Sequence, residues 1–431
     1  MIKKSLLAAL SIASRIGSAL LLMVVCGRVL GVSDFGSMMY WLTVGGILAQ
    51  FVDFGMPQRV SVLIARGEHG GASQTAGVLQ AAFATKLVLS ALVVLIAAAF
   101  IGLNEQGRSE AMFALPLLLS QLLLPWTDLG SAVLRLEDQY KRETHWQLLG
   151  SMAVLAIVAA TALISKSIVA VAYAFLLARI IVAYGWIRML HGAAGLRRGT
   201  SFDWPTVRGF VAGSFTSALD VMATNVFSSL DTLLGRYYLG TVALGNYQAG
   251  LRLVQGSAQL SGVLQSVLLP TVARKFAASE GRGNTTDPTI VAYALFGLVL
   301  GLGTALLGKP VILLLFGSGF QAAADLAGPF GALIAVRFLA GGFGLLLMAQ
   351  GRPGLRLWSY ALAALGLAAS VWLTLPQAGL PGLVRAMVLA YGLLTALYAL
   401  KLAFTSKWYR AGKWVWLTIF LNMAFIWSVI R

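Results

Sequence analysis

Six basic side chains lie inside long apolar runs of the sequence, where a charge is costly. An Arg or Lys at the centre of a membrane-spanning helix costs about 2.5–3.5 kcal/mol on insertion scales, so such a residue normally faces water, a partner or a ligand. The six are Arg15, Lys86, Arg179, Arg252, Arg337 and Arg385. A guanidinium group holds phosphate or carboxylate through paired hydrogen bonds. The chemistry that these residues could perform is therefore the binding of an anion.

Polar residues recur at helical intervals around two of these arginines. The two series are Ser11, Arg15 and Ser18, at i, i+4 and i+7, and Arg252, Gln255 and Gln259, at i, i+3 and i+7. Residues with this spacing share one face of a helix, so each series predicts a polar stripe that faces a cavity. The predicted substrate-binding residues are Arg15, Lys86, Arg179, Arg252, Arg337, Gln255 and Gln259.

Acidic residues in the same runs are fewer than the basic ones. They are Asp53, Asp128, Asp220 and Asp231, and each is a candidate ion-coupling residue. Asp220 and Asp231 are separated by about three helical turns and share a face. Because the basic residues are in excess, a cavity that they line should attract anions, and phosphate-linked cargo is the natural inference.

Simpler interpretations apply to several of these side chains. Arg385 and Lys86 lie near predicted helix ends, from which a long side chain can reach the lipid headgroups. Arg179 could pair with Asp128 and hold the fold together, and Asp231 could be structural because it lies near a helix end.

The composition places these residues in a membrane protein. Of 431 residues, 59% are hydrophobic and only 11% are charged, and the mean hydropathy is +0.84. Apolar runs near twenty residues recur along the whole length, and each could cross a hydrocarbon core of about 30 Å as a helix. The predicted class is an all-α polytopic membrane protein.

The apolar runs predict twelve spans and a thirteenth candidate. They lie at roughly 6–27, 37–57, 77–103, 111–134, 146–165, 167–190, 208–234, 244–270, 289–307, 326–349, 355–375 and 382–404, and the candidate at 413–430 could instead lie in the interface. With Lys3 and Lys4 in the cytoplasm, every cytoplasmic connection holds at least two basic residues, as the positive-inside rule requires. The first apolar run continues past Arg15, which favours a span over a cleaved signal.

Several functions are excluded by what the sequence lacks. The net charge of +17 comes from basic residues scattered between apolar runs, which is typical of cytoplasmic loops and not of a nucleic-acid-binding face. The single cysteine, Cys26, excludes an internal disulfide, and no Cys or His cluster has metal-site spacing. The phrase GTALLGKP ends at Pro310, where a phosphate-binding loop needs Ser or Thr. We therefore expect no nucleic-acid partner, no metal, no cofactor and no enzymatic activity.

A short glycine-bounded phrase occurs twice, half a chain apart. The pattern L-G-x-x-x-x-G runs from Leu30 to Gly36 and again from Leu239 to Gly245, between predicted helices 1 and 2 and between 7 and 8. Leu-Gly turns are common in membrane proteins, but a displacement of six helices would place both copies on the same side. The pattern therefore predicts parallel repeats about an axis along the membrane normal.

Longer phrases resemble a known family. They are "GRVLGVSDFGSMMYWLTVGGILAQFVDFGMPQRVSVLIAR" at 27–66, "SSLDTLLGRYYLGTVALGNYQAGLRLVQ" at 228–255, "LLPTVAR" at 268–274, "LLLFGSGF" at 313–320 and "LMAQGRPGLRL" at 347–357. The sequence resembles the polysaccharide-export branch of the multidrug, oligosaccharidyl-lipid and polysaccharide exporter (MOP) superfamily, and within it the Wzx-type O-antigen flippases. Asp231 matches the Asp-x-Leu-Leu phrase of that family, but Thr232 stands where a basic residue is common.

The resemblance implies a MATE-like pair of six-helix lobes around a central cavity. We expect the lobes at 1–200 and 201–404, followed at 405–431 by a basic segment and the candidate thirteenth helix. It also implies alternating-access transfer of a lipid diphosphate-linked O-antigen or exopolysaccharide unit from the cytoplasmic to the periplasmic leaflet of a bacterial inner membrane. The implied partners are that lipid-linked oligosaccharide, membrane lipids and other polysaccharide assembly proteins.

Two other functions are compatible with the same sequence. One is a cation-coupled multidrug exporter of the same superfamily, in which an acidic pair such as Asp220 and Asp231 would matter more than the arginines. The other is a membrane enzyme that polymerises or ligates lipid-linked sugars. Such enzymes generally need a sizeable outer loop, and the outer connections here are short. With no nucleotide site, protons, sodium ions or the membrane potential would have to supply direction to transport.

Overall fold

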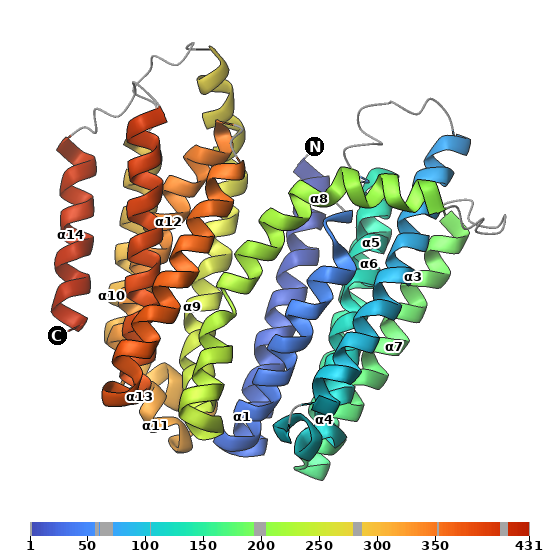
Figure 1. Ribbon diagram of the computed structural model, residues 1–431, viewed down its shortest axis with the longest axis horizontal. Helices are drawn as coiled ribbons and strands as arrows, with labels where there is room; N and C mark the ends of the chain where they lie inside the picture. The colour runs from blue at the N-terminus through green and yellow to red at the C-terminus, as the bar shows by residue number, and fades with distance from the viewer. Residues whose placement is uncertain are drawn as a thin grey trace. The chain divides into compact units, whose positions relative to one another are not determined.

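The structure is a computed structural model that describes residues 2–56, 60, 72–103, 105–193, 204–278, 287–350, 353–405 and 413–430. Every regular element in these ranges is helical (Figure 1). The chain divides into two compact units, Met1–Asn225 (unit 1) and Val226–Arg431 (unit 2). The predicted boundary between the lobes, at residues 200 and 201, lies outside the described residues.

Unit 1 is a bundle of long apolar helices. Its helices are α1 (Ile2–Asp53), α3 (Ala72–Leu103), α4 (Glu105–Leu122), α5 (Leu124–Leu136), α6 (Tyr140–Ser165), α7 (Ile168–Ala193) and α8 (Trp204–Phe227). α6 packs beside α1 and α7, and α4 packs against α1, α3 and α7. Val52, Val93 and Leu122 form one of the buried apolar contacts that join α1, α3 and α4.

Unit 2 is organised around one buried helix, α12. The elements of this unit are α9 (Leu230–Ala278), α10 (Asp287–Phe316), the 3₁₀ turn η1 (Ser318–Phe320), α11 (Gln321–Ala324), α12 (Ala327–Ala349), α13 (Pro353–Thr405) and α14 (Lys413–Ile430). α12 packs against α9, α10, α13 and α14. A Cβ atom on Gly331 would lie 2.3 Å from the carbonyl oxygen of Gly301, so α10 and α12 approach backbone to backbone.

Both copies of the repeated phrase contain a glycine in the same unusual conformation. Gly31 interrupts α1 at φ 79° and ψ 174°, and Gly240 interrupts α9 at φ 77° and ψ −171°. A residue with a Cβ atom is strained at such positive φ angles, which explains why glycine stands at both places. Gly379, at φ 56°, interrupts α13 between the two spans predicted there. The two glycine turns predicted from the repeat are therefore present, and their backbone conformations match.

Two predicted helices have the wrong limits. The span expected at 111–134 is two helices, because Pro125 has no N–H to bond the carbonyl of Gln121 and α4 ends at Leu122. The span expected at 208–234 ends at Phe227, and α9 begins at Leu230. As a result Arg236, which was expected in an outer connection, is buried in α9.

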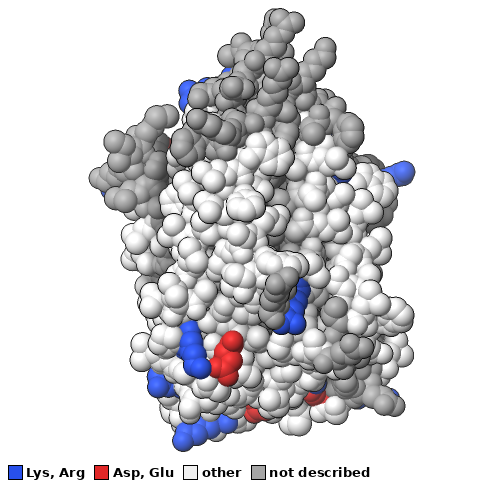
Figure 2. Space-filling model, turned by 90° about the vertical axis from the view of Figure 1, so that its left-hand side faces the viewer, with Lys and Arg blue, Asp and Glu red and all other residues white. Residues whose placement is uncertain are grey.

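The described helices are those of a multi-pass membrane protein. Nine of them are long and apolar enough to cross a membrane, and the stretch Leu10–Asp53, which contains the Gly31 turn, corresponds to two predicted spans. α14 coincides with the thirteenth candidate and packs on α10 and α12, where Asn422 donates a hydrogen bond to the carbonyl of Ala294 at 3.1 Å. Figure 2 shows a face of the molecule whose described atoms are largely free of charged groups. The all-α class is confirmed, and the count of twelve spans stays a prediction.

Candidate functional site

An ion pair joins α1 and α5 in unit 1. Arg15 Nη1 lies 3.0 Å from Asp128 Oδ1, and the two side chains are 55% and 45% exposed within the described chain. Ser11 and Ser18, on the same face of α1, are buried. The described chain does not enclose this pair, so Arg15 could exchange its carboxylate partner for another anion.

Arg179 on α7 lies close enough to this pair to interact with both members. It is attracted electrostatically by Asp128 and repelled by Arg15. Its Nε atom is buried and has no hydrogen-bond partner among the described residues. The simpler interpretation, in which Arg179 is the partner of Asp128, is therefore only partly right, because Arg15 makes the hydrogen bond. A buried donor without an acceptor costs about 1–3 kcal/mol, and an incoming anion could relieve that cost.

Lys86 on α3 is completely buried. Its Nζ atom lies 3.3 Å from Asp53 Oδ1 and donates to the carbonyl oxygen of Pro125 at 2.5 Å. Asp53 is the last residue of α1, and Pro125 lies in the first turn of α5. The alternative in which Lys86 extends to the headgroups is wrong, since none of its side chain is exposed. Its charge is held by groups of two other helices, α1 and α5.

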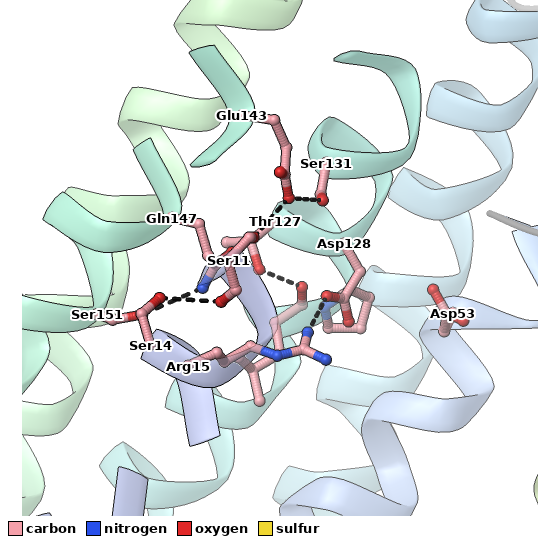
Figure 3. Close-up of polar contacts among 12 residues, drawn as sticks. Ser11, Ser14, Arg15, Asp53, Thr127, Asp128, Ser131, Glu143, Gln147 and Ser151 are labelled. Carbon is pink, nitrogen blue, oxygen red and sulfur yellow. Dashed lines mark hydrogen bonds and ion pairs between the residues drawn. The ribbon is translucent and has the colours of Figure 1, made fainter. Parts of the chain in front are cut away.

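The sequence reasoning missed a buried carboxylate, Glu143, in the first turn of α6. Glu143 Oε1 accepts hydrogen bonds from Ser11 Oγ at 2.9 Å, Ser131 Oγ at 2.7 Å and Arg135 Nη2 at 2.9 Å. Its Oε2 atom is buried without a described partner. Figure 3 shows Glu143 with Ser11 and Ser131 beside the Arg15–Asp128 pair, with Asp128 between Arg15 and Asp53. The spacing of Glu143, Gln147 and Ser151 at i, i+4 and i+8 was a helical signal that could have found it.

In unit 2 the main polar cluster is centred on Asp231, near the start of α9. The Asp231 side chain is fully buried. Its Oδ2 atom accepts from the Tyr247 hydroxyl at 2.5 Å, and its Oδ1 atom accepts from the backbone N–H and the hydroxyl of Thr232 at 2.6 and 3.1 Å. Thr232 thus donates hydrogen bonds to Asp231. It stands at the position where the Wzx-type flippases that the sequence resembles commonly have a basic residue.

Arg252 is joined to this cluster through neutral groups. Gln248 Nε2 donates to Thr232 Oγ1 at 2.7 Å, and Arg252 Nη2 donates to Gln248 Oε1 at 2.6 Å. Asp231 attracts Arg252 electrostatically, but no described carboxylate hydrogen-bonds it. Gln255 is half-buried and Gln259 is exposed, further along α9.

Arg337 on α12 is held by an aromatic ring. Its guanidinium carbon lies 4.9 Å from the ring centre of Tyr391, a cation–π contact, and it is also attracted by Asp231. Arg385 is half-buried. Its Nε atom is buried and has no hydrogen-bond partner among the described residues, so this atom does not reach the lipid headgroups. Asp220 lies in α8, but its side chain is outside the described part of the structure.

The predicted site residues therefore form one group in each unit, with basic groups in excess in both. Arg15, Lys86 and Arg179 accompany Asp53 and Asp128 in unit 1, and Arg252 and Arg337 accompany Asp231 in unit 2. Whether the two groups bind one ligand stays a prediction.

The fold is that of known membrane transporters. An inward-closed structure of the lipid II flippase MurJ matches with a TM-score of 0.74 and 11% identity, over 98% of this chain and 97% of that chain. An inward-facing multidrug resistance MATE family transporter of the MOP superfamily matches with a TM-score of 0.68 and 14% identity, over 98% and 99%. A MOP superfamily transporter from Pyrococcus furiosus, with a binding pocket of reverse polarity, matches with a TM-score of 0.58 and 17% identity, over 92% and 94%. The chain therefore has the fold of these transporters.

The family is given by the sequence. Residues 25–325 match the family model described as polysaccharide biosynthesis protein. The chain belongs to this family of polysaccharide biosynthesis proteins, and the resemblance to the polysaccharide-export branch of the MOP superfamily is confirmed. No curated protein matches the sequence.

Proposed function

We propose that this protein is a flippase for a lipid diphosphate-linked oligosaccharide, an O-antigen or exopolysaccharide repeat unit. It would carry this unit from the cytoplasmic to the periplasmic leaflet of a bacterial inner membrane, with its N-terminus in the cytoplasm. Membership of a polysaccharide biosynthesis family and a fold shared with a lipid II flippase support this class of cargo.

The single observation that carries the proposal is the set of arginines without a carboxylate hydrogen bond. Among the described residues, Arg252 donates only to Gln248, and Arg337 lies over Tyr391. Arg179 has a buried Nε atom without an acceptor. Each guanidinium thus keeps charge and donors for an additional anion, and a diphosphate supplies two negative groups with oxygens suited to paired hydrogen bonds.

Binding and transport follow from these groups by alternating access. In the inward-open state the diphosphate binds to arginines that have charge and donors to spare, such as Arg252 and Arg337 in unit 2, while the lipid tail stays in the bilayer. The cargo can shift the equilibrium between states only by binding them with different affinity. Rocking of one unit against the other then exposes the head group to the periplasm.

The test is leaflet translocation in proteoliposomes. Purified protein is reconstituted with a defined diphosphate-linked oligosaccharide, and the fraction accessible from each side is followed with proton and sodium gradients imposed in turn. We expect translocation that depends on the protein and on one of the gradients or the membrane potential. Absence of translocation under every gradient, with the protein shown to be folded, would contradict the proposal.

A cation-coupled multidrug exporter is the second candidate, and the buried Asp231 favours it. This carboxylate is held by Tyr247 and Thr232 inside unit 2, as an ion-coupling group would be. The two functions separate in the same vesicles, because an exporter would move cationic drugs and would lose activity in Asp231→Asn more than in Arg252→Gln. Product formation from lipid-linked sugars without added enzymes would instead indicate a polymerase or ligase.

A further inference from the structure

Two interruptions of the helical backbone meet at the ammonium group of Lys86. α1 ends at Asp53, and the next residues, Phe54 and Gly55, have φ angles of 45° and 66°. The break between α4 and α5 falls at Leu123, just before Pro125. The Lys86 Nζ atom lies 3.3 Å from Asp53 Oδ1 and 2.5 Å from the Pro125 carbonyl oxygen.

This set of ligands is one that would suit a free monovalent cation. Membrane transporters hold cations with carboxylates, backbone carbonyls and the negative ends of helices. Here Asp53 lies at the negative end of α1, and the Pro125 carbonyl lies in the first turn of α5. Asp128 adds a second negative charge nearby, since it interacts electrostatically with both Lys86 and Asp53. Ser90, one turn further along α3, carries a buried hydroxyl oxygen without a described partner.

We propose that Lys86 is the resident cation of unit 1, a tethered ammonium that occupies a latent monovalent-cation site formed by Asp53 and the Pro125 carbonyl. It is a positioning residue and does not touch the cargo. It joins the end of α1 to the start of α5 and offsets part of the negative charge beside Asp128, which leaves Asp128 to hold Arg15. This assignment corrects its expected role in substrate binding and does not depend on which cargo is transported.

The burial of Lys86 distinguishes this positioning role from a role in binding the cargo. The Lys86 side chain is 0% exposed and both of its hydrogen-bond acceptors belong to the protein, whereas the Arg15 side chain is 55% exposed. An anion that displaced Asp53 from Lys86 would leave that partly buried carboxylate without its partner, which is costly in a low-dielectric environment. Lys86 therefore keeps its partners when the cargo binds.

Removal of the tether should turn unit 1 into a site that binds a free cation. In Lys86→Ala, Asp53 and the Pro125 carbonyl remain, and removal of three methylene groups and the ammonium group opens a vacancy beside them. The melting temperature of purified protein is measured in NaCl, KCl, methylammonium chloride and choline chloride at equal ionic strength. We expect Lys86→Ala to gain about 2 °C in its preferred small cation relative to choline, at ten times the dissociation constant. The wild type should show a smaller difference.

Two matched variants separate site filling from a general salt effect. Asp53→Asn/Lys86→Ala removes the carboxylate, so its melting temperature should not depend on the cation more than that of the wild type. Lys86→Met fills the space with an uncharged chain of similar length, so its melting temperature should not respond to the cation either. Binding of radioactive sodium gives a second readout, and Lys86→Ala should bind one equivalent more than the wild type if sodium is the preferred ion.

The outcomes decide the proposal in either direction. The proposal is overturned if the melting temperature of Lys86→Ala depends on the cation no more than that of the wild type does. It is also overturned if Asp53→Asn/Lys86→Ala responds to the cation as strongly as Lys86→Ala does. If Lys86→Ala does not accumulate in membranes, the same series is run on Lys86→Ser, whose short side chain also leaves the space between Asp53 and the Pro125 carbonyl open. The absence of a cation response there overturns the proposal in the same way.

Discussion

The two units stabilise the charged groups of their polar clusters in different ways. Unit 1 pairs each of three basic residues with a carboxylate: Arg15 with Asp128, Lys86 with Asp53 and Arg135 with Glu143. Unit 2 surrounds its one described buried carboxylate, Asp231, with hydroxyl and backbone donors, and holds its arginines with an amide and an aromatic ring.

This difference suggests a division of labour under the proposed function. An exposed cation whose partner is a carboxylate can exchange that partner for another anion, so unit 1 can exchange ligands at Arg15, whereas the buried Lys86 keeps its partner. A cation that is held by a side-chain amide or an aromatic ring has a neutral partner. Its positive charge is therefore not cancelled, and it attracts anions whether or not cargo is bound. Arg252 and Arg337 would then provide the standing attraction for the cargo, and Arg15 the exchangeable contact.

The largest expected effect on stability comes from Glu143→Ala in unit 1. The change leaves Arg135 without its carboxylate and removes the acceptor of Ser11 and Ser131, so we expect a loss of about 3 kcal/mol. Thermal unfolding monitored by tryptophan fluorescence measures it. Ser131→Ala, which removes one donor only, should cost about 1 kcal/mol and serves as the matched control. Equal losses in the two variants would contradict the central role of the carboxylate.

Asp231→Asn in unit 2 should cost less, about 1–2 kcal/mol. The neutral side chain keeps the volume and one acceptor, but its amide opposes one of the donors that surround the native carboxylate. Tyr247→Phe, which removes the 2.5 Å hydrogen bond to Asp231, should cost about 1 kcal/mol in the same unfolding assay. If Asp231→Asn proved as damaging as Glu143→Ala, the contrast between the units would be wrong.

Gly31→Ala and Gly240→Ala should cost about 1–2 kcal/mol each, and the two losses should be equal. A Cβ atom at either position meets no atom within 4 Å, so the cost is that of positive φ alone. Gly46→Ala and Gly256→Ala are matched controls, because they lie in the helical parts of α1 and α9, are also uncrowded and lack positive φ. The controls should be neutral or slightly stabilising. A clear inequality between Gly31 and Gly240 would break the correspondence of the two turns.

The smallest effect is expected at Asp325, between α11 and α12. A hydrogen bond from Lys309, at 2.8 Å, holds the pKa of this exposed carboxyl below its usual value. Because the folded-state pKa is lowered, the contribution to stability is present at neutral pH and is lost as the pH falls below about 4. The melting temperatures of wild type and Asp325→Asn should therefore differ slightly at pH 7 and converge at low pH. A difference that persisted at low pH would point to a cause other than charge.

Hydropathy and helical spacing were sufficient to predict the class of fold and the clustering of charged residues. The repeated phrase located the turns at Gly31 and Gly240, because only glycine adopts their conformation readily. The break at Leu123 was missed although Pro125 marks it, since the surrounding run is apolar throughout and hydropathy does not register backbone interruptions.

The pairing of charges could not be predicted from the sequence. The preference of Asp128 for Arg15 over Arg179 depends on how α1, α5 and α7 pack, which no spacing within one helix reveals. Glu143 was overlooked because it directly follows Lys141 and Arg142 in the segment between two predicted spans. The basic residues of that segment are typical of a cytoplasmic loop. Its burial depends on contacts with α1 and α5, which are distant in sequence.

The affinity of the purified protein for a diphosphate-linked oligosaccharide, compared with an uncharged analogue, tests the central claim most directly. The account predicts that the wild type prefers the diphosphate, and that Arg252→Gln and Arg337→Gln each weaken its binding about ten-fold without altering affinity for the analogue. Arg15→Gln should weaken it less, because Asp128 competes for that side chain. Equal affinity of the wild type for both compounds, or unchanged diphosphate binding in both unit 2 variants, would contradict the account.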